Sequence, residues 1–283
     1  MNWVPLFFFD AVCHQLDLNA LPEVGQLSGG WSKFGAEHGE KRREFVFSCK
    51  VDEQTFSYHL RDKRDYSSVF AVGDLDVDHD RITSITWDPP SHAYKRVSLD
   101  KLQLDILPTV ALHVTKCYWS YLDPKRRAQN QIFFNAFKNC LGFNEICVQE
   151  QGEESRQFVA RQVELGNVEK LSLGCAGKWP EPEKLAETLR TFVNSTRFHQ
   201  LIIPGGLRNY FELFALFLER ALADELKKGA YIRVDKLVFD ENRLSVLHPE
   251  CRVESEEVAW CVPNSSHRIT VKHDRAFLAM EIC

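Results

Sequence analysis

The sequence lacks any long hydrophobic run. Its longest nearly apolar stretches, residues 4–12 and 211–218, are about nine residues long and each contains an acid, whereas a membrane-spanning helix needs about 20 apolar residues. An excess of basic charge is also absent, because 35 Lys and Arg residues stand against 40 Asp and Glu residues. The net charge of -5 leaves no basic field to hold a phosphate backbone. We therefore expect no membrane and no nucleic acid as a partner.

Cysteine pairs at metal-binding or redox spacing are missing as well. The chain has nine cysteines, an odd number, and no two of them form a C-x-x-C motif. Buried, reduced thiols explain this set more simply than a disulfide framework. The N-terminus has neither the basic region nor the cleavage site of a signal peptide, and Asp10 interrupts its apolar run. These features predict a cytoplasmic or nuclear protein.

Recognisable catalytic motifs are absent too. No G-x-S-x-G, H-E-x-x-H, P-loop or G-x-G-x-x-G string occurs. Residues 74–80 alternate acids as a calcium loop does, but His79 replaces the glycine needed at the sixth position and Ile85 replaces the glutamate at the twelfth. The glycines of residues 174–177 and 205–206 fit turns that follow strands. We therefore assign no catalytic, cofactor-binding or metal-binding residue, expect no cofactor, and predict that the chain is not an enzyme.

Residues 1–42 are predicted to form a small helical module. Pro5 suits a first helical position, and apolar residues follow it at helical spacing: Phe8, Phe9, Val12 and Leu16. A second helix is expected after Asn19, with Gly29 and Gly30 loosening its end. Its apolar face holds Leu21, Val24, Leu27 and Trp31. Each large apolar side chain left in water forgoes about 1.5–3 kcal/mol, and a hairpin of this length cannot bury so many alone. We therefore expect another surface to cover the module.

Residues 43–120 are predicted to be rich in β-strands. The hydrophobic period changes to two, in short segments rich in β-branched and aromatic residues that turn-forming pieces separate. The expected strands lie at residues 45–47, 55–58, 69–72, 82–87 and 110–114. Charged residues interleaved with these segments predict one exposed face and one covered face.

Residues 121–283 contain a recurring strand pattern, in which apolar residues occupy the first, fourth and sixth positions of a six-residue segment. It occurs at residues 143–148, 168–173, 198–203 and 234–239; residues 99–104 precede the series, and Ile269 and Val271 continue it. Helices are expected at residues 124–140, 153–164, 183–193 and 209–228. This alternation is typical of an irregular solenoid of the leucine-rich-repeat kind. An ordinary α/β sheet would give the same string, so both architectures stay open, each with helices on at least one side of the sheet.

The N-terminal spacing resembles the F-box. Val4 and Pro5 stand where that motif has Leu-Pro, Val12 is the aliphatic residue seven positions after the proline, and Trp31 closes the motif without a gap. Together with the strand-helix units, this arrangement is similar to the F-box-like families of nematodes. The resemblance implies the substrate-recognition subunit of an SCF-type ubiquitin ligase. Such a subunit binds a Skp-type adaptor, and through it the cullin scaffold, with its N-terminal helices and an unknown protein substrate with its C-terminal domain. Carried over to this chain, the partner-binding residues are Pro5, Leu6, Phe8, Phe9, Val12, Leu16, Leu21, Val24, Leu27 and Trp31.

Two alternatives remain open at this point. A free-standing protein-interaction domain with no ligase role would bury Phe7, Phe8 and Phe9 against its own domain. An α/β enzyme of unknown reaction would show a deep pocket at the carboxyl ends of parallel strands, near residues 174–177 and 205–206.

Overall fold

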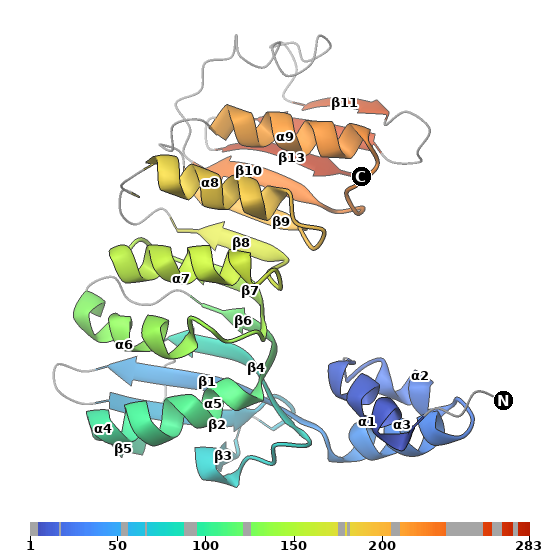
Figure 1. Cartoon of the computed structure of the whole chain (residues 1–283), viewed down its shortest axis with the longest axis vertical. Helices are drawn as coiled ribbons and strands as arrows, with labels where there is room; N and C mark the ends of the chain where they lie inside the picture. The colour runs from blue at the N-terminus through green and yellow to red at the C-terminus, as the bar shows by residue number, and fades with distance from the viewer. Residues whose placement is uncertain are drawn as a thin grey trace. The chain divides into compact units, whose positions relative to one another are not determined.

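The chain has a mixed α/β fold with two compact units, Met1–Cys117 and Tyr118–Cys283. The computed structural model shown in Figure 1 describes residues 5–16, 18–51, 56–65, 67–87, 95–120, 126–174, 179, 182–204, 210–235, 257–261, 268–273 and 277–283. Within these ranges, no helix is both long enough and apolar enough to cross a membrane.

Three helices open the first unit: α1 (Leu6–Gln15), α2 (Leu21–Gly25) and α3 (Gly30–Lys41). Pro5 is the N-cap of α1, one position before the first helical position that was predicted for it. The expected second helix was wrong in extent, because α2 ends at Gly25 and a separate helix, α3, begins at Gly30, with Gly29 as its N-cap. Gly29 has a φ of 70°, a conformation that favours glycine, and this lets the chain turn into α3.

The strands of the first unit are β1 (Arg43–Val51), β2 (Phe56–Asp62), β3 (Val69–Phe70), β4 (Asp80–Trp87) and β5 (Lys95–Val97), and a short 3-10 turn, η1 (Val72–Asp74), follows β3. One of them, β2, is buried over five consecutive residues, so the predicted exposed face is absent from that strand. β1 pairs with β4 in parallel and with β2 in antiparallel orientation, while β3 and β5 both pair with β2. Phe45, Phe47 and Cys49 of β1 are fully buried, as expected for the covered face of a sheet.

Residues 99–113 form one helical segment, which contradicts two predicted strands. It comprises α4 (Leu99–Lys101), the π-helical turn η2 (Leu102–Ile106) and α5 (Leu107–His113). The strands predicted at residues 99–104 and 110–114 were therefore wrong. The buried residues Leu102, Ile106 and Val110 recur every four positions, so a helical period explains this run better than a strand pattern does. β6 (Val114–Trp119) follows directly and crosses the boundary between the two units.

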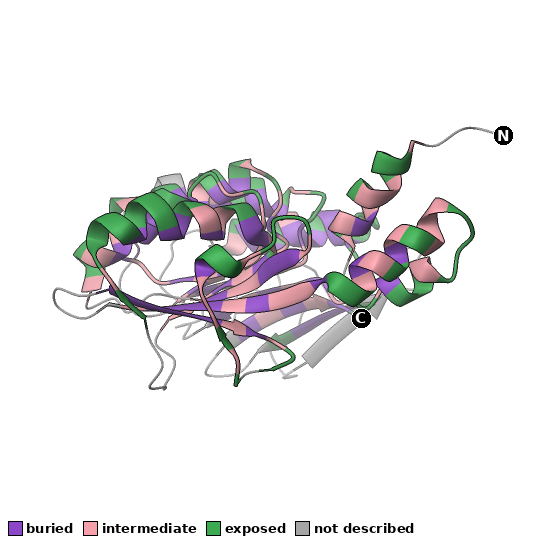
Figure 2. Cartoon of the chain, turned by 90° about the horizontal axis from the view of Figure 1, so that it is seen from below, coloured by how far each residue is buried: buried purple, intermediate pink, exposed green. Residues whose placement is uncertain are grey.

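The second unit alternates helices with parallel strands and ends in antiparallel ones. Its elements are α6 (Arg127–Phe137), β7 (Phe143–Val148), α7 (Glu153–Glu164), β8 (Lys170–Leu173), α8 (Pro182–Val193), β9 (Gln200–Pro204), α9 (Tyr210–Leu222), β10 (Tyr231–Asp235), β11 (Glu257–Cys261), β12 (Arg268–His273) and β13 (Phe277–Ile282). Strands β7, β8, β9 and β10 pair in sequence order and in parallel. Figures 1 and 2 show that α6, α7, α8 and α9 all lie on one face of this sheet.

The predicted strand pattern agrees with the observed register over β7, β8 and β9. Ile146 is paired with Leu171, and Leu171 with Leu201, so the fourth position of the pattern lies at one level on each strand. In β10 the predicted register was wrong, since Ile232 pairs with Leu201. With Ile232 at the fourth position, the first position of the pattern falls on Gly229. Because glycine has no apolar side chain, the pattern could not be recognised there from the sequence. The proposed Leu237 and Phe239 positions lie outside the described residues.

The prediction that the repeat continues through Ile269 and Val271 was wrong. β12, which carries both residues, runs antiparallel to its neighbours β11 and β13. The strand order at this end of the sheet is β10, β13, β12, β11. A further copy of the pattern was overlooked in β6, where Val114, Cys117 and Trp119 are buried at the same three positions.

Candidate partner-binding surface

A small aromatic cluster holds the N-terminal helices together. The ring of Phe9 meets that of Trp31 edge-on, with centroids 4.7 Å apart, and stacks on Phe34 at 6.5 Å. Phe8 also lies edge-on to Trp31, at 6.0 Å. Such pairs contribute about 0.5–1.5 kcal/mol each beyond the burial of their area. Trp31 therefore acts at least partly as a core residue of the module.

Four large apolar side chains of the module are exposed. The exposed fractions are 60% for Leu6, 75% for Phe7, 44% for Phe8 and 51% for Leu27. Figure 2 shows the exposed start of α1 beside the more buried helix interiors. We call these four residues the exposed apolar set. Apolar groups of this size are normally covered when they gather on one small module, so the set is a candidate contact for another protein.

The predicted partner-binding residues divide into three groups by burial. Leu6, Phe8 and Leu27 are exposed and Leu21 is fully buried, whereas the rest are partly buried, namely Pro5, Phe9, Val12, Leu16, Val24 and Trp31. Val4, which the F-box resemblance also uses, lies outside the described residues. Sequence reasoning left out Phe7, the most exposed of these side chains. The uninterrupted apolar run of residues 6–9 was the available signal, because consecutive helical residues cannot all face one core.

A buried arginine fixes the end of α1 to the end of α3. The side chain of Arg42 is only 2% exposed, and its guanidinium donates to the carbonyl oxygen of Leu16 at 2.6 Å and to that of Cys13 at 2.7 Å. These carbonyls lie at the C-terminal end of α1, where helices leave backbone acceptors unsatisfied; that of Cys13 also accepts from the backbone N–H of Leu16 at 3.2 Å. A cation at this position also interacts favourably with the helix dipole.

His38 links the same arginine to the outer side of α1. Its Nε2 lies 2.8 Å from Oδ1 of Asp10, and its Nδ1 lies 3.2 Å from Nη2 of Arg42. Because Arg42 can only donate, Nδ1 must accept, which places the proton of the neutral ring on Nε2, where it is donated to Asp10. Asp10, His38 and Arg42 thus form a continuous chain of hydrogen bonds between α1 and α3.

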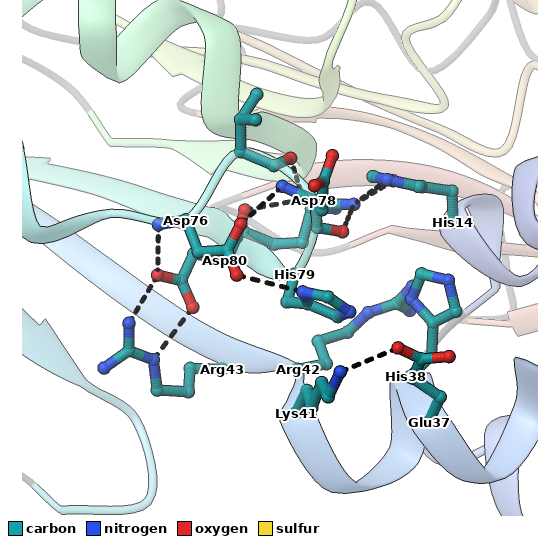
Figure 3. Close-up of polar contacts among 12 residues, drawn as sticks. His14, Glu37, His38, Lys41, Arg42, Arg43, Asp76, Asp78, His79 and Asp80 are labelled. Atoms are coloured by element: carbon teal, nitrogen blue, oxygen red, sulfur yellow. Dashed lines mark hydrogen bonds and ion pairs between the residues drawn. The ribbon is translucent and has the colours of Figure 1, made fainter.

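Two further contacts lie close to these helices in the same unit; one joins α1 to β4 and the other joins β1 to β4 (Figure 3). Arg81 of β4 donates to the ring of His14 in α1, with Nη2 2.8 Å from Nε2. Arg43 holds the buried carboxylate of Asp80 with two hydrogen bonds, of 2.9 and 2.6 Å. Burial lowers the pKa of the Arg81 guanidinium to about 10, an effect that the Asp10 carboxylate opposes, so Arg81 stays charged at neutral pH. The contact between Arg81 and His14 supports the position of α1, whose first turn carries most of the exposed apolar set.

The acidic residues 74–80 form a turn and do not form a metal site. Asp76 accepts a hydrogen bond from the backbone N–H of Asp78 at 2.9 Å and pairs with His79 at 3.0 Å. The hydrogen bond from His79 is the main cause that lowers the pKa of Asp76. Asp80 is already held by Arg43. Across the described residues, no group of three or more His, Cys, Asp or Glu side chains is arranged to bind a metal ion.

The region of the alternative enzyme site is only partly described. Gly174 follows β8, and a Cβ atom there would lie 2.6 Å from Cγ of Gln149, so close packing accounts for this glycine. Residues 175–178 and 205–209, which include the other glycines of the prediction, lie outside the described residues. The amides of Asn130 and Gln151 are hydrogen-bonded to each other at 2.6 Å. None of these observations marks a catalytic residue.

A comparison with known protein families, curated proteins and solved structures finds no match to this chain.

Proposed function

We propose that this chain is the substrate-recognition subunit of an SCF-type ubiquitin ligase. The N-terminal helices, an F-box-like module, bind a Skp-type adaptor and through it the cullin scaffold. The C-terminal strand-helix domain binds a target protein, which is then marked for degradation. The mechanism is proximity, because the receptor raises the concentration of target lysines near the ubiquitin carrier and this chain itself breaks no bond.

The exposed apolar set is the observation that carries this proposal. Full burial of a large apolar side chain contributes about 1.5–3 kcal/mol, so covering four half-exposed groups returns several kcal/mol, roughly half of what a micromolar complex needs. Helix packing against a second protein provides this cover. The polar chain from Asp10 to Arg42 holds α1 in place before binding, which reduces the entropy lost on docking.

The substrate-binding role is assigned to the second unit. The common register of β7, β8 and β9, with helices on one face, supports an irregular solenoid of the leucine-rich-repeat kind. Cys147, Ser172 and Ile202 are paired across these strands and only partly buried, unlike the core residues beside them. We assign target binding to this face of the sheet.

The exposure of Phe7 and Phe8 also weighs against the main alternative. A free-standing interaction domain was expected to bury Phe7, Phe8 and Phe9 against its own domain; Phe7 and Phe8 are 75% and 44% exposed, whereas Phe9 is partly buried. The enzyme alternative has no catalytic residue among the described residues to support it.

Co-purification of the full chain with a Skp-type adaptor tests the proposal. The test variant carries Phe7→Ser and Leu27→Ser, two exposed positions whose change spares the aromatic cluster. The control variant carries Leu104→Ser and Leu112→Ser, which remove two equally apolar side chains, each 75% exposed, from the helical segment of the same unit.

We expect the wild-type chain and the control variant to retain the adaptor at micromolar concentration, and the test variant to bind at least about tenfold more weakly. Thermal melting of all three proteins verifies that they are folded. The proposal is wrong if the wild-type chain does not bind the adaptor, or if the test variant binds as well as the control.

A further inference from the structure

The residues that surround Ser98 form an unusual local pattern. Lys95 and Arg96 lie three and two positions before Ser98, and the apolar Leu99 follows it. Across the whole sequence, Ser98 is the only serine or threonine with Lys or Arg at both preceding positions. Two cations a few residues before one hydroxyl are a pattern that an enzyme with acidic substrate pockets can recognise through ion pairs.

The same residues are accessible in the folded chain. Lys95, Arg96, Ser98 and Leu99 are all exposed, and Val97 between them is partly buried. The hydroxyl oxygen of Ser98 accepts one long hydrogen bond, from the backbone N–H of Lys101 at 3.3 Å. The hydroxyl is therefore free to be approached from solvent.

The backbone before Ser98 can leave the sheet at low cost. β5 pairs with β2 over three residues, Lys95, Arg96 and Val97, at the edge of the first unit's sheet. Ser98 itself is extended, with φ of -69° and ψ of 160°. A short edge strand held by a few backbone hydrogen bonds opens far more readily than a core strand, so this segment can enter an enzyme cleft in extended form.

We propose that Ser98 is a phosphorylation site for a basophilic serine/threonine protein kinase. The Ser98 oxygen attacks the γ-phosphorus of ATP, and an O–P bond forms while the bond from the γ-phosphorus to the bridging oxygen breaks. ADP leaves, and the hydroxyl proton passes to the catalytic base of the kinase. Acidic groups of the kinase pair with Lys95 and Arg96, and an apolar pocket receives Leu99.

The phosphorylated product fits the folded structure. A phosphate adds about -1.5 to -2 charge, which offsets the two positive charges of Lys95 and Arg96. Its oxygens can accept the hydrogen bond from the backbone N–H of Lys101 that the hydroxyl oxygen accepts now. This N–H lies at the start of the helical residues 99–113. Phosphorylation thus changes the charge of an exposed surface without removing an existing contact.

Ser67 provides a matched internal control. Arg64 lies three positions before it, but the residue at the second position is Asp65, whose charge would repel the acidic groups of the kinase. The Ser67 hydroxyl also donates to Oδ1 of Asp65 at 2.5 Å. Ser67 is exposed as Ser98 is, so accessibility alone predicts that both are modified, whereas the basic pattern predicts only Ser98.

The test is phosphorylation of the folded full chain with ATP and the catalytic subunit of the cAMP-dependent kinase as a basophilic probe. We expect about one phosphate per chain by intact mass, located at Ser98 by peptide mapping. Ser98→Ala should abolish it, Ser67→Ala should not change it, and Arg96→Gln should lower kcat/KM by at least about tenfold. Melting curves verify that the variants are folded.

Three results would overturn the proposal. They are no phosphate on the folded chain, phosphate at Ser67 in place of Ser98, and modification of a peptide of residues 92–103 without modification of the folded chain. Adaptor binding plays no part in this experiment, so its outcome is independent of the ligase proposal.

Discussion

Replacement of Arg42 by methionine tests whether the buried arginine holds α1 in place. Methionine keeps the apolar length of the side chain and removes the guanidinium. Two hydrogen bonds to the carbonyls of Cys13 and Leu16 are lost, and His38 loses its donor at Nδ1. Hydrogen bonds to a charged group contribute about 1.5–3 kcal/mol each, so we expect the first unit to lose about 3–5 kcal/mol of stability.

Differential scanning calorimetry of the full chain measures this loss. For a unit of this size, a loss of 3–5 kcal/mol lowers the Tm of its transition by roughly 12–20 °C. Lys41→Met is the matched control, because it removes the same charge from the neighbouring exposed side chain, which pairs with Glu37 on the helix surface. We expect the control to change the Tm by no more than about one degree. If the two variants melt together, the α1 carbonyls do not depend on Arg42 and the argument fails.

Three further predictions concern the cores and the titratable groups. Trp119→Leu should destabilise the second unit by about 3–4 kcal/mol in urea titrations, because its buried indole packs on the rings of Phe134, Phe137, Phe143 and Phe158; a loss below about 1 kcal/mol would contradict this packing. Burial, with the charge of Arg61, lowers the pKa of His59. The unfolded chain therefore takes up the proton first as the pH falls below about 6.5, so the first unit should lose stability there, and His59→Gln should flatten that dependence in urea titrations from pH 7.5 to about 5. Burial raises the pKa of the Cys13 and Cys49 thiols, so iodoacetamide should modify the exposed Cys283 and leave both unmodified in the folded chain; peptide mass spectrometry reads this out, and early labelling of Cys49 would refute the burial.

Elements with a clear period were predictable from the sequence. The helix Glu153–Glu164 has its predicted bounds, and its buried apolar residues, Phe158, Val159 and Val163, recur at helical spacing. The strand pattern also placed β7, β8 and β9 in their observed register. Residues 99–104 were misassigned because leucines at three nearby positions fit a strand and a helix equally well, and only the length of the following segment distinguishes them.

The sequence predicted which helices carry the candidate surface, but it did not predict which of their residues are exposed and which pack within the module. The sequence showed too much apolar area in the N-terminal helices, and Leu6, Phe8 and Leu27 are indeed exposed. It did not show that the partly buried ring of Trp31 packs on Phe8 and Phe9 of the same module. The roles of Arg42 and His38 were also hidden, because their partners are backbone carbonyls 26 and 29 residues away and a carboxylate 28 residues away. Such pairings depend on tertiary structure and leave no periodic signal.

In the part of the sheet that the structure describes, strands β11 and β12 are joined to the parallel strands only through β13, which follows them in the sequence. β11 and β12 precede β13 in the sequence, yet in the order of strands β13 stands between them and β10. When β13 separates from β10, the whole antiparallel group loses its attachment to the parallel strands. We therefore expect backbone amides of all three strands to exchange with deuterium together, as one cooperative opening, while the amides of β7 and β8 stay protected.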